Sequence, residues 1–368
     1  MYNSTRVSGV RDVLRLPATI LEMLGAVAGA RFNTRGSYEP THHIWSRGLA
    51  LMCDHNGGFD YVRKQRGGGS APLPFDPGDY AAVRDGDLVW VRANSLPAFL
   101  EHVLPRIEAR FALVTGDEDW SIPSDFEGSR AILANPNVIC WFAQNFDGTD
   151  TSGKLHPIPL GLDFHTVANR RKWKHWQATP AQQEAELDRL RAKMPANGVR
   201  LVRAHADFHF NKGRKLDEHS RDAVYKSLVG NPNVDFQTRK LPRHDLWREK
   251  TRYAFEVSPH GNGLDCHRTW ESLLLGNIPI VRHSSLDQLY DGLPVVIVND
   301  FSEITSQALQ RWHGEHHGTF ADVEVQLRLT NRFWIARVRQ MLDEKMSGMQ
   351  RRPASTGEVI DRAAHRVG

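Results

Sequence analysis

The stretch AFEVSPHGNGLDCHRTWESLLLGNIPIV, residues 254–281, says most about the fold of this chain. An apolar run ends at Val257, a loop that contains Pro259 and two glycines follows, and a helical pattern then leads to a second apolar run. A Rossmann-like sheet meets a phosphate-bearing ligand in this way, because Gly261 and Gly263 let backbone N–H groups approach an anion. The stretch therefore predicts a strand, an anion-binding loop, a helix and another strand.

The helix expected in this stretch has Asp265 as its N-cap and ends at Gly276. Arg268 lies near its start, where a cation completes an anion site that the helix dipole already favours, and Glu271 projects from the next turn. A cation suits phosphate and a carboxylate suits sugar hydroxyls, so this pair indicates a nucleotide. The alternative is that Arg268 and Glu271 only pair with each other on a solvated helix face.

Short apolar runs alternate with helical patterns along the rest of the chain, which predicts an α/β protein with parallel sheets. Strands are expected at 49–55, 87–94, 110–117, 137–145 and 156–163 in the first half, and at 199–206, 254–258, 278–282 and 294–298 in the second. Helices are expected at 96–109 and at about 216–229, 243–252 and 265–275.

The length of 368 residues exceeds the usual size of a single core, so two domains are expected. A charged stretch of helical periodicity follows residue 165 and contains no strand, which marks the boundary. We therefore predict a first domain over 1–165 and a second over 166–324, with a terminal helix at about 325–348.

The composition describes an ordinary globular protein, with 40% hydrophobic and 24% charged residues and a net charge of +4. Three scattered cysteines are too few for a disulfide framework, which favours a reducing, cytoplasmic location. Residues 11–30 have the spacing of an amphipathic helix, expected to pack on the first domain, with peripheral membrane contact and a cleaved signal as alternatives. Their apolar run is too short to span a bilayer.

Residues 258–279, together with SSLDQLYDGLPVVIVND at 284–300, resemble the donor-binding motif of exostosin-like glycosyltransferases. Three upstream segments are similar to the N-terminal half of bacterial members: FALVTGDEDWSIP at 111–123, WFAQNFDG at 141–148 and KLHPIPLGLDF at 154–164. The resemblance covers about residues 100–345. It implies the GT-B fold, in which two Rossmann-like domains face a central cleft and a C-terminal helix crosses back to the first domain. It also implies a nucleotide-sugar donor, for which a UDP-sugar is expected.

The resemblance also implies a set of donor-binding residues. Arg214 and Arg268 are expected to hold the diphosphate, because guanidinium groups bind phosphate oxygens in pairs and offset leaving-group charge without a metal. Glu271 is expected to accept hydrogen bonds from the ribose. The remaining residues expected to line the donor site are Asn211, Ser258, Asn262 and Gly263.

Gly263 bears on the stereochemistry of the expected reaction. Many retaining GT-B enzymes carry a second glutamate eight residues before the ribose-binding one, and Gly263 occupies that place here. This favours inversion, which requires a general base that deprotonates the acceptor hydroxyl. Asp117 and Asp119 follow a first-domain strand and are the expected candidates, ahead of Asp54, His55 and Asp163. Each of these aspartates could instead be a turn former or a helix cap.

Two other patterns suggest ligands. Asp117-Glu118-Asp119 is literally a DxD sequence, by which metal-dependent GT-A enzymes hold manganese, but that alternative leaves 254–281 unexplained. HGEHHG at 313–318 is expected to be a solvated turn rather than a metal site. No bound metal is therefore expected.

Gln144 and Asn145 lie beside two aromatics, and we expect their amides to face a sugar.

The sequence thus predicts an inverting, metal-independent glycosyltransferase that moves a sugar to a hydroxyl of a glycan or another polymer, in polysaccharide biosynthesis. One alternative is transfer to modified bases of DNA, for which the basic run at 170–176, with its two tryptophans, would supply contacts. Another is a non-catalytic nucleotide- or glycan-binding protein of the same fold.

Overall fold

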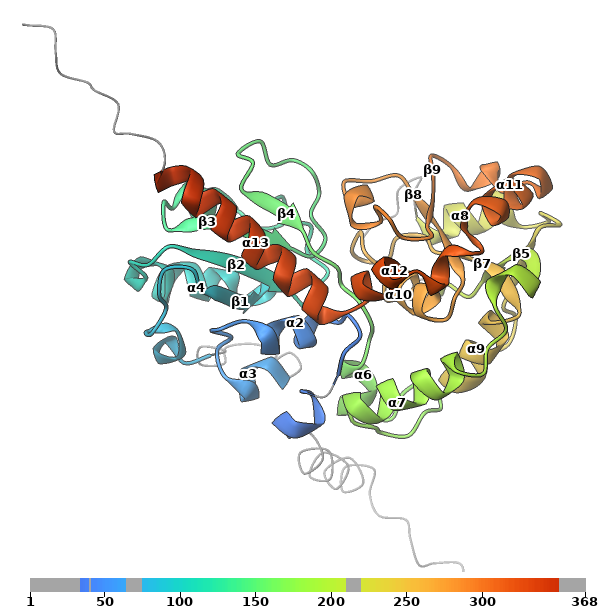
Figure 1. Ribbon diagram of the computed structural model, residues 1–368, viewed down its shortest axis with the longest axis horizontal. Helices are drawn as coiled ribbons and strands as arrows, with labels where there is room; N and C mark the ends of the chain where they lie inside the picture. The colour runs from blue at the N-terminus through green and yellow to red at the C-terminus, as the bar shows by residue number, and fades with distance from the viewer. Residues whose placement is uncertain (1–33, 40, 64–74, 210–219, 351–368) are drawn as a thin grey trace, which may run out of the picture.

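The computed structural model describes residues 34–39, 41–63, 75–209 and 220–350. Over these residues the chain forms two lobes that lie side by side, each built on a parallel sheet with helices around it (Figure 1). The predicted α/β class and two-lobed GT-B arrangement are confirmed. The helix expected within residues 11–30 lies outside the described residues.

The sheet of the first lobe has four strands in the order β1-β2-β3-β4, and every neighbouring pair is parallel. Its strands are β1 (Leu88–Arg92), β2 (Phe111–Gly116), β3 (Val138–Ala143) and β4 (Leu155–Pro157). The apolar side chains of β1, β2 and β3 are buried on both faces of the sheet, as continuous apolar runs predict.

The strand predicted at 49–55 is wrong, because these residues lie largely in helix α2 (Ser46–Met52). Periodicity does not separate a short buried strand from a short buried helix. Leu49 and Ala50 are buried, and α2 packs against the C-terminal helix α13 (Asn331–Gln350). Extended pairing is limited to His55, which forms an isolated bridge with Val89.

Three more helices accompany the first sheet: α3 (Phe59–Arg63), α4 (Leu96–His102) and α5 (Ser129–Ala134). Helix α4 stops well before the predicted end at residue 109. Pro105 lies shortly after its last residue and has no N–H to donate to the helix, so the chain continues as a 3-10 turn over Leu104–Arg106.

The sheet of the second lobe has the strand order β6-β5-β7-β8-β9, again entirely parallel. Its strands are β5 (Leu201–Ala206), β6 (Val234–Phe236), β7 (Tyr253–Val257), β8 (Ile278–Arg282) and β9 (Val296–Val298). The helices of this lobe are α8 (Arg221–Leu228), α9 (Arg243–Lys250), α10 (His267–Leu274), α11 (Ser306–His316) and α12 (Val323–Arg328). The sequence did not predict β6, which has only three residues.

Helices α6 (His165–Asn169) and α7 (Pro180–Arg191) lie between the two sheets along the chain. Thr179 and Gln182 form a capping box that fixes the start of α7. The side chain of Glu184 on α7 then accepts the backbone N–H groups of His42 and His43. Helix α7 is therefore tied to the start of the first lobe, and the exact division at residue 165 stays a prediction.

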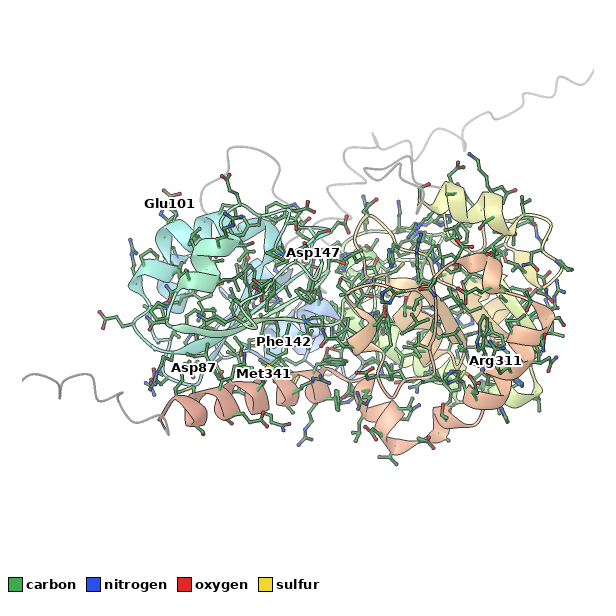
Figure 2. The ribbon with its side chains drawn as sticks, turned by 90° about the horizontal axis from the view of Figure 1, so that it is seen from above. Asp87, Glu101, Phe142, Asp147, Arg311 and Met341 are labelled. Carbon is green, nitrogen blue, oxygen red and sulfur yellow. The ribbon has the colours of Figure 1, made fainter. Side chains whose placement is uncertain are left out.

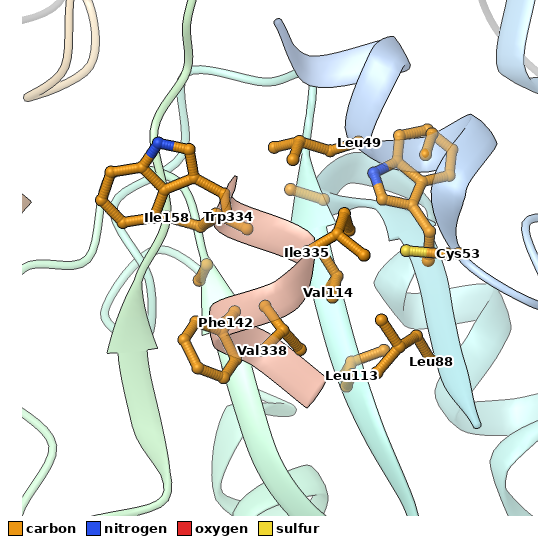
Figure 3. Close-up of a cluster of buried hydrophobic side chains, with 14 of the residues drawn as sticks. Leu49, Cys53, Leu88, Leu113, Val114, Phe142, Ile158, Trp334, Ile335 and Val338 are labelled. Carbon is orange, nitrogen blue, oxygen red and sulfur yellow. The ribbon is translucent and has the colours of Figure 1, made fainter. Parts of the chain in front are cut away.

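Helix α13 crosses back to the first lobe, as the predicted fold requires. Trp334, Ile335 and Val338 on α13 are buried, and Figure 3 shows them among Val114 of β2 and Phe142 of β3. Figure 2 shows Met341 of α13 under the first lobe and Arg311 of α11 in the other lobe. A chain end packed across the lobe boundary in this way couples the two lobes.

Helix α10 packs at the boundary between the lobes. Trp270 and Leu273 on this helix are buried in the same hydrophobic cluster as the first lobe and α13, whereas most of the second lobe has a cluster of its own. The stretch that fixes the second sheet therefore also forms part of its contact with the first lobe. Across the described residues, no helix is long and apolar enough to cross a membrane.

We expect Trp334→Ala to destabilise the protein by about 3–5 kcal/mol, because it leaves a cavity beneath α13 and removes a buried indole. Chemical denaturation followed by fluorescence and circular dichroism measures this loss. The matched control is Arg332→Ala, an exposed position on the same helix that should cost less than about 0.5 kcal/mol. Equal stability of the two variants would contradict the packing of α13 on the first lobe.

Candidate functional site

A cleft of about 520 Å³ opens between the two lobes. The first lobe and the segment around α6 line one side of it, with Arg47, Arg92, Asp117, Glu118, Asp119, Leu160, His165 and Arg170. The second lobe contributes Arg221, Gly261, Asn262, Gly263, Asp265, Cys266 and His267. The lining includes residues that follow β2 and β7, so the cleft lies at the carboxyl ends of parallel strands, where α/β sheets bind their ligands.

Asn145 joins the two lobes next to residues that line this cleft. Its Oδ1 atom accepts the backbone N–H of Asp265 at 2.8 Å, and its Nδ2 atom donates to the carbonyl oxygen of Glu118 at 2.9 Å. The residue has a φ of 56°, a left-handed conformation that asparagine tolerates better than most residues. Asn145 thus connects a β3 loop to the loop before α10.

Asp265 completes this joint from the other side. Its carboxylate accepts the backbone N–H of Leu160 at 2.7 Å and the indole N–H of Trp270 at 2.9 Å. The predicted N-cap role of Asp265 is not observed, because Cys266 is the N-cap of α10 and makes no side-chain capping bond. The first turn of α10 therefore lies on the cleft without a capping side chain.

Gly263 has a packing role that the sequence did not predict. A Cβ atom at this position would lie only 2.7 Å from the amide atoms of Asn145. The lobes therefore meet more closely than any residue with a side chain allows. The absence of a glutamate at position 263 has this steric reason, whatever the stereochemistry.

Asp117 lies at the end of β2 between two arginines. Its Oδ2 atom is 3.3 Å from Arg47 and 3.0 Å from Nε of Arg92, and all three side chains are largely buried. Burial alone would raise the pKa of Asp117, but its interactions with Arg47, His165 and Arg92 outweigh burial and hold that pKa below its ordinary value. An aspartate held ionised by two guanidinium groups is suited to orient them and poorly suited to take a proton.

The backbone of Asp117 is also constrained, with a φ of 64°. Gln144 holds this conformation, since its Oε1 atom accepts the N–H of Asp117 at 2.7 Å and its Nε2 atom donates to Pro159. Gln144 and Asn145, which we expected to face a sugar, are both buried and use their amides inside the protein. Neither lines the cleft within the described residues.

Asp119 and Asn262 face each other at the cleft mouth. Asp119 is exposed, and the Nδ2 atom of Asn262 lies 3.3 Å from its carboxylate. These two predicted site residues come from opposite lobes and both line the cleft. Asp119 is therefore placed to contact a ligand, which leaves its predicted role open as a proposal.

Arg268 points away from the cleft lining, into a buried ionic cluster. Its Nε atom is paired with Asp207, which is also 2.9 Å from Nζ of Lys250. Burial opposes the charge of Arg268, but Cys266, Asp207 and Glu256 raise its pKa above the ordinary value. This cluster could not be predicted, because Asp207, Lys250 and Arg268 are far apart along the chain.

The other residues predicted to bind the donor have varied positions. Glu271 lies 3.6 Å from Arg243 and does not line the cleft, and the hydroxyl of Ser258 is buried against that of Thr269. Asn211 and Arg214 lie outside the described residues. The roles predicted for these four residues stay proposals.

Arg221, which the sequence did not single out, supplies a cation to the second-lobe wall. Its guanidinium donates to the carbonyls of His260 and His209 and approaches Sγ of Cys266 at 3.6 Å. Burial lowers its pKa from the ordinary value, and none of the described carboxylates forms an ion pair with it. Its place at the start of α8, shortly after the predicted donor-binding residues Asn211 and Arg214, was the available signal.

His165 on the opposite wall was also missed. It is the first residue of α6, and its Nδ1 atom lies 3.1 Å from Oδ1 of Asp163. Burial lowers the pKa of His165 from its ordinary value of 6.5, although Asp163 and Asp117 oppose this effect. A neutral histidine oriented by a carboxylate is a suitable general base. Asp163 was considered as a base, but His165, two residues later, was not.

Asp163, His165 and His267 form the group of described residues whose geometry would also allow a metal ion. Their potential ligand atoms all lie within 4.8 Å of one another, and Nδ1 of His267 is 2.6 Å from the carbonyl oxygen of Gly161. However, Oδ1 of Asp163 already accepts the backbone N–H of Thr166, and Arg47 adds a repulsive positive charge near His165. These features favour a dyad of Asp163 and His165 over a metal site.

No protein-family model and no curated protein sequence matches the chain. Solved structures similar to it include α,α-trehalose 6-phosphate synthase from Burkholderia multivorans, with 13% identity, 74% of each chain covered and a TM-score of 0.40. The UDP-forming synthase from Burkholderia vietnamiensis has 12% identity, coverage of 74% of this chain and 76% of its own, and a TM-score of 0.41. An α1,3-fucosyltransferase has 13% identity, coverage of 71% and 78%, and a TM-score of 0.35.

We expect Gly263→Ala to destabilise the protein by about 1–3 kcal/mol, because the new methyl group forces Asn145 away from Asp265. Gly318→Ala is the matched control, since a Cβ there meets no atom within 4 Å. Thermal and denaturant unfolding measure both changes.

A double-mutant cycle with Asn145→Gly makes this test specific, because glycine accepts the left-handed backbone and removes the clashing amide. The cost of Gly263→Ala should fall in the Asn145→Gly background. An unchanged cost would show that the loop before α10 does not meet Asn145 as described.

Proposed function

We propose that this protein is a nucleotide-sugar-dependent glycosyltransferase whose chemistry takes place in the cleft between the lobes. The observation that carries the proposal is the arrangement of two complementary walls. Arg221 and the uncapped start of α10 form a wall suited to a diphosphate, and the dyad of Asp163 and His165 lies on the other wall.

The second-lobe wall suits a leaving nucleoside diphosphate. Arg221 is a partly buried guanidinium without a carboxylate partner among the described residues, and Gly261 lets the backbone pass close to it. A helix start adds partial positive charge at the same wall. These groups would stabilise the negative charge that develops on the diphosphate as the bond to the sugar breaks. Arg214 and Asn211 remain proposed partners of the same group.

His165 is the base that we propose for the acceptor. With Nδ1 directed at Asp163, the imidazole has Nε2 as the atom that can take the proton of an acceptor hydroxyl. The hydroxyl oxygen then attacks the anomeric carbon, and the bond to the diphosphate breaks. This replaces Asp117 in that role, since Asp117 is held between Arg47 and Arg92, while Asp119 stays a second candidate.

Inversion of configuration is the stereochemical outcome that we propose. A base on the wall opposite the leaving group suits in-line attack on the anomeric carbon. Proton NMR of the first-formed product distinguishes the two anomers. A product with the donor's own anomeric configuration would sink this part of the proposal.

A non-catalytic nucleotide-binding protein of the same fold is the alternative that the dyad disfavours. A protein that only binds needs no neutral histidine beside a carboxylate, opposite the anion site. Binding of the donor without hydrolysis or transfer would support that alternative.

The donor test is a thermal-shift screen of nucleoside diphosphates and sugar nucleotides on the full chain. A ligand at about 100 times its Kd should stabilise the protein by about 2.7 kcal/mol, which is a rise in Tm of roughly 3–4 °C for a chain of this length. We expect UDP and one UDP-sugar to give the largest shift. Arg221→Gln should weaken binding about 10- to 100-fold, because a charged hydrogen-bond donor is lost.

Two further variants make the donor test specific. Arg221→Lys keeps the charge and should lose less affinity, while Arg311→Gln, an exposed change on α11, should bind like the wild type. Normal binding by a folded Arg221→Gln variant would refute the assigned diphosphate wall.

The base test compares binding and turnover. His165→Ala should bind the donor normally but lower kcat by about 10²- to 10⁴-fold, because no base remains to take the proton from the hydroxyl of the acceptor substrate. Asp163→Asn should give a smaller loss, and His317→Ala, an exposed histidine on another element, should give none. In the wild type, kcat/KM should stay on its plateau as pH falls to below 6.5 and then decline, since burial lowers the pKa of His165. Wild-type turnover by His165→Ala would exclude it as the base.

Metal independence is tested by chelation. Transfer should survive dialysis against EDTA and 1,10-phenanthroline, because Arg221 supplies the positive charge at the leaving group. His267→Ala distinguishes a metal site from a catalytic dyad. If Asp163, His165 and His267 bind a metal, this variant should lose activity as fully as His165→Ala does. If Asp163 and His165 act as a dyad, it should lose less. Complete loss on chelation with recovery on added manganese or zinc would favour a metal site.

A further inference from the structure

The segment between α6 and α7, two helices that Figure 1 labels, contains a turn with an unusual conformation. The N–H of His175 donates to the carbonyl oxygen of Lys172 at 2.8 Å, and the two residues between them, Trp173 and Lys174, have φ values of 50° and 56°. Two consecutive left-handed residues define a turn of type I′, which normally requires asparagine and glycine. Bulky side chains at these positions cost free energy, so the surroundings must hold the turn in place.

Contacts from three elements hold this turn. The N–H of Arg243 donates to the carbonyl oxygen of Trp173 at 3.3 Å, and the Arg243 guanidinium lies 5.8 Å from the Trp173 ring. Nε2 of His175 is 2.8 Å from the carboxylate of Glu186 on α7, and Nζ of Lys174 reaches the carbonyl of Lys240 at 3.4 Å. The conformation of the turn is therefore held by specific contacts with the rest of the protein.

The turn presents a tryptophan and several cations to solvent. Trp176 has 72% of its surface exposed, and the Arg171 guanidinium covers one face of its ring at 4.2 Å from the centroid. The exposed cations of the segment are Arg170, Arg171, Lys172 and Lys174. None of them forms an ion pair with a carboxylate of the described chain. Large indoles are rarely left so exposed without a partner.

This surface is continuous with the cleft. Arg170 belongs to the cleft lining and follows directly after α6, the helix whose first residue is His165. A chain bound over the turn would therefore reach the wall that carries the proposed base. The wall itself carries as many carboxylates (Asp117, Glu118 and Asp119) as arginines (Arg47, Arg92 and Arg170), so the excess of positive charge on this side lies on the turn.

We propose that Arg170–Trp176 form a docking ridge for the acceptor, and that the acceptor is an anionic glycan chain. The inference rests on the proposed sugar transfer and names its acceptor class. The free face of Trp176 suits stacking on a sugar ring, and cations interleaved with aromatic rings suit carboxylate or phosphate groups spaced along a glycan. Duplex DNA offers no exposed base face to the indole, so it fits this ridge less well.

Binding of the full chain to soluble polysaccharides, without donor, tests the ridge. Polygalacturonate is the anionic probe, dextran is the neutral probe, and biolayer interferometry or affinity electrophoresis gives the Kd. We expect polygalacturonate to bind more tightly than dextran. Trp176→Ala should weaken that binding about five- to tenfold through loss of stacking and of the indole that positions Arg171. Arg171→Ala/Lys172→Ala should weaken it and make it less sensitive to salt.

The matched control is Lys226→Ala/Arg311→Ala, which removes two exposed cations of the second lobe that do not line the cleft. It should bind polygalacturonate as the wild type does, and unfolding curves of all variants should coincide. Equal affinities of wild type and Trp176→Ala would overturn the ridge, and so would tighter binding of a random-sequence DNA than of polygalacturonate at equal salt. Because no donor is present, this result is independent of whether transfer or His165 catalysis is confirmed.

Discussion

The contact of Asn145 with the loop before α10 is the constraint on which the site depends. The asparagine adopts a left-handed conformation, bonds to Asp265 and Glu118, and leaves no room for a Cβ atom at Gly263. Leu160, through its N–H to Asp265, adds a second bond across the same boundary. These short hydrogen bonds fix the distance between the two walls of the cleft. The proposed leaving-group site and the proposed base therefore have a defined separation across the cleft.

The distribution of charge follows from this arrangement. Most buried ions of the second lobe neutralise one another, as in the cluster of Asp207, Lys250 and Arg268. Arg221 differs, because its described partners are carbonyls and a sulfur atom. On the first wall, Asp117 is shared by Arg47 and Arg92. Glu118 and Asp119 also line this wall, so its arginines are balanced by carboxylates. Arg221 thus supports an anionic donor at the second-lobe wall, and the exposed cations of Arg170–Trp176 support an anionic acceptor beside the cleft.

The fold could be predicted from the sequence because its strands are continuous apolar runs with glycine or polar residues at their ends. The elements β7, α10 and β8 lie in the stretch that predicted them, except that β7 begins one residue before it and β8 ends one residue after it. Short elements were harder, since β6 has three residues and α2 is too short to show a helical period. In the site, Gly263, Asn262, Asp117 and Asp119 were expected in the cleft and do line it. The orientation of Arg268 depends on Asp207, which is distant in sequence. The proposed role of His165 as a base depends on its contact with Asp163 and on the wall across the cleft. Local sequence patterns therefore revealed neither.

A crystal structure of the protein with a bound nucleoside diphosphate is the decisive test of the diphosphate site. We expect diphosphate oxygens within hydrogen-bond distance of the Arg221 guanidinium and of backbone N–H groups at the start of α10, with His165 across the cleft from the β-phosphate. A diphosphate held by Arg47 and Arg92 on the first wall, or a nucleotide bound outside the cleft, would contradict it.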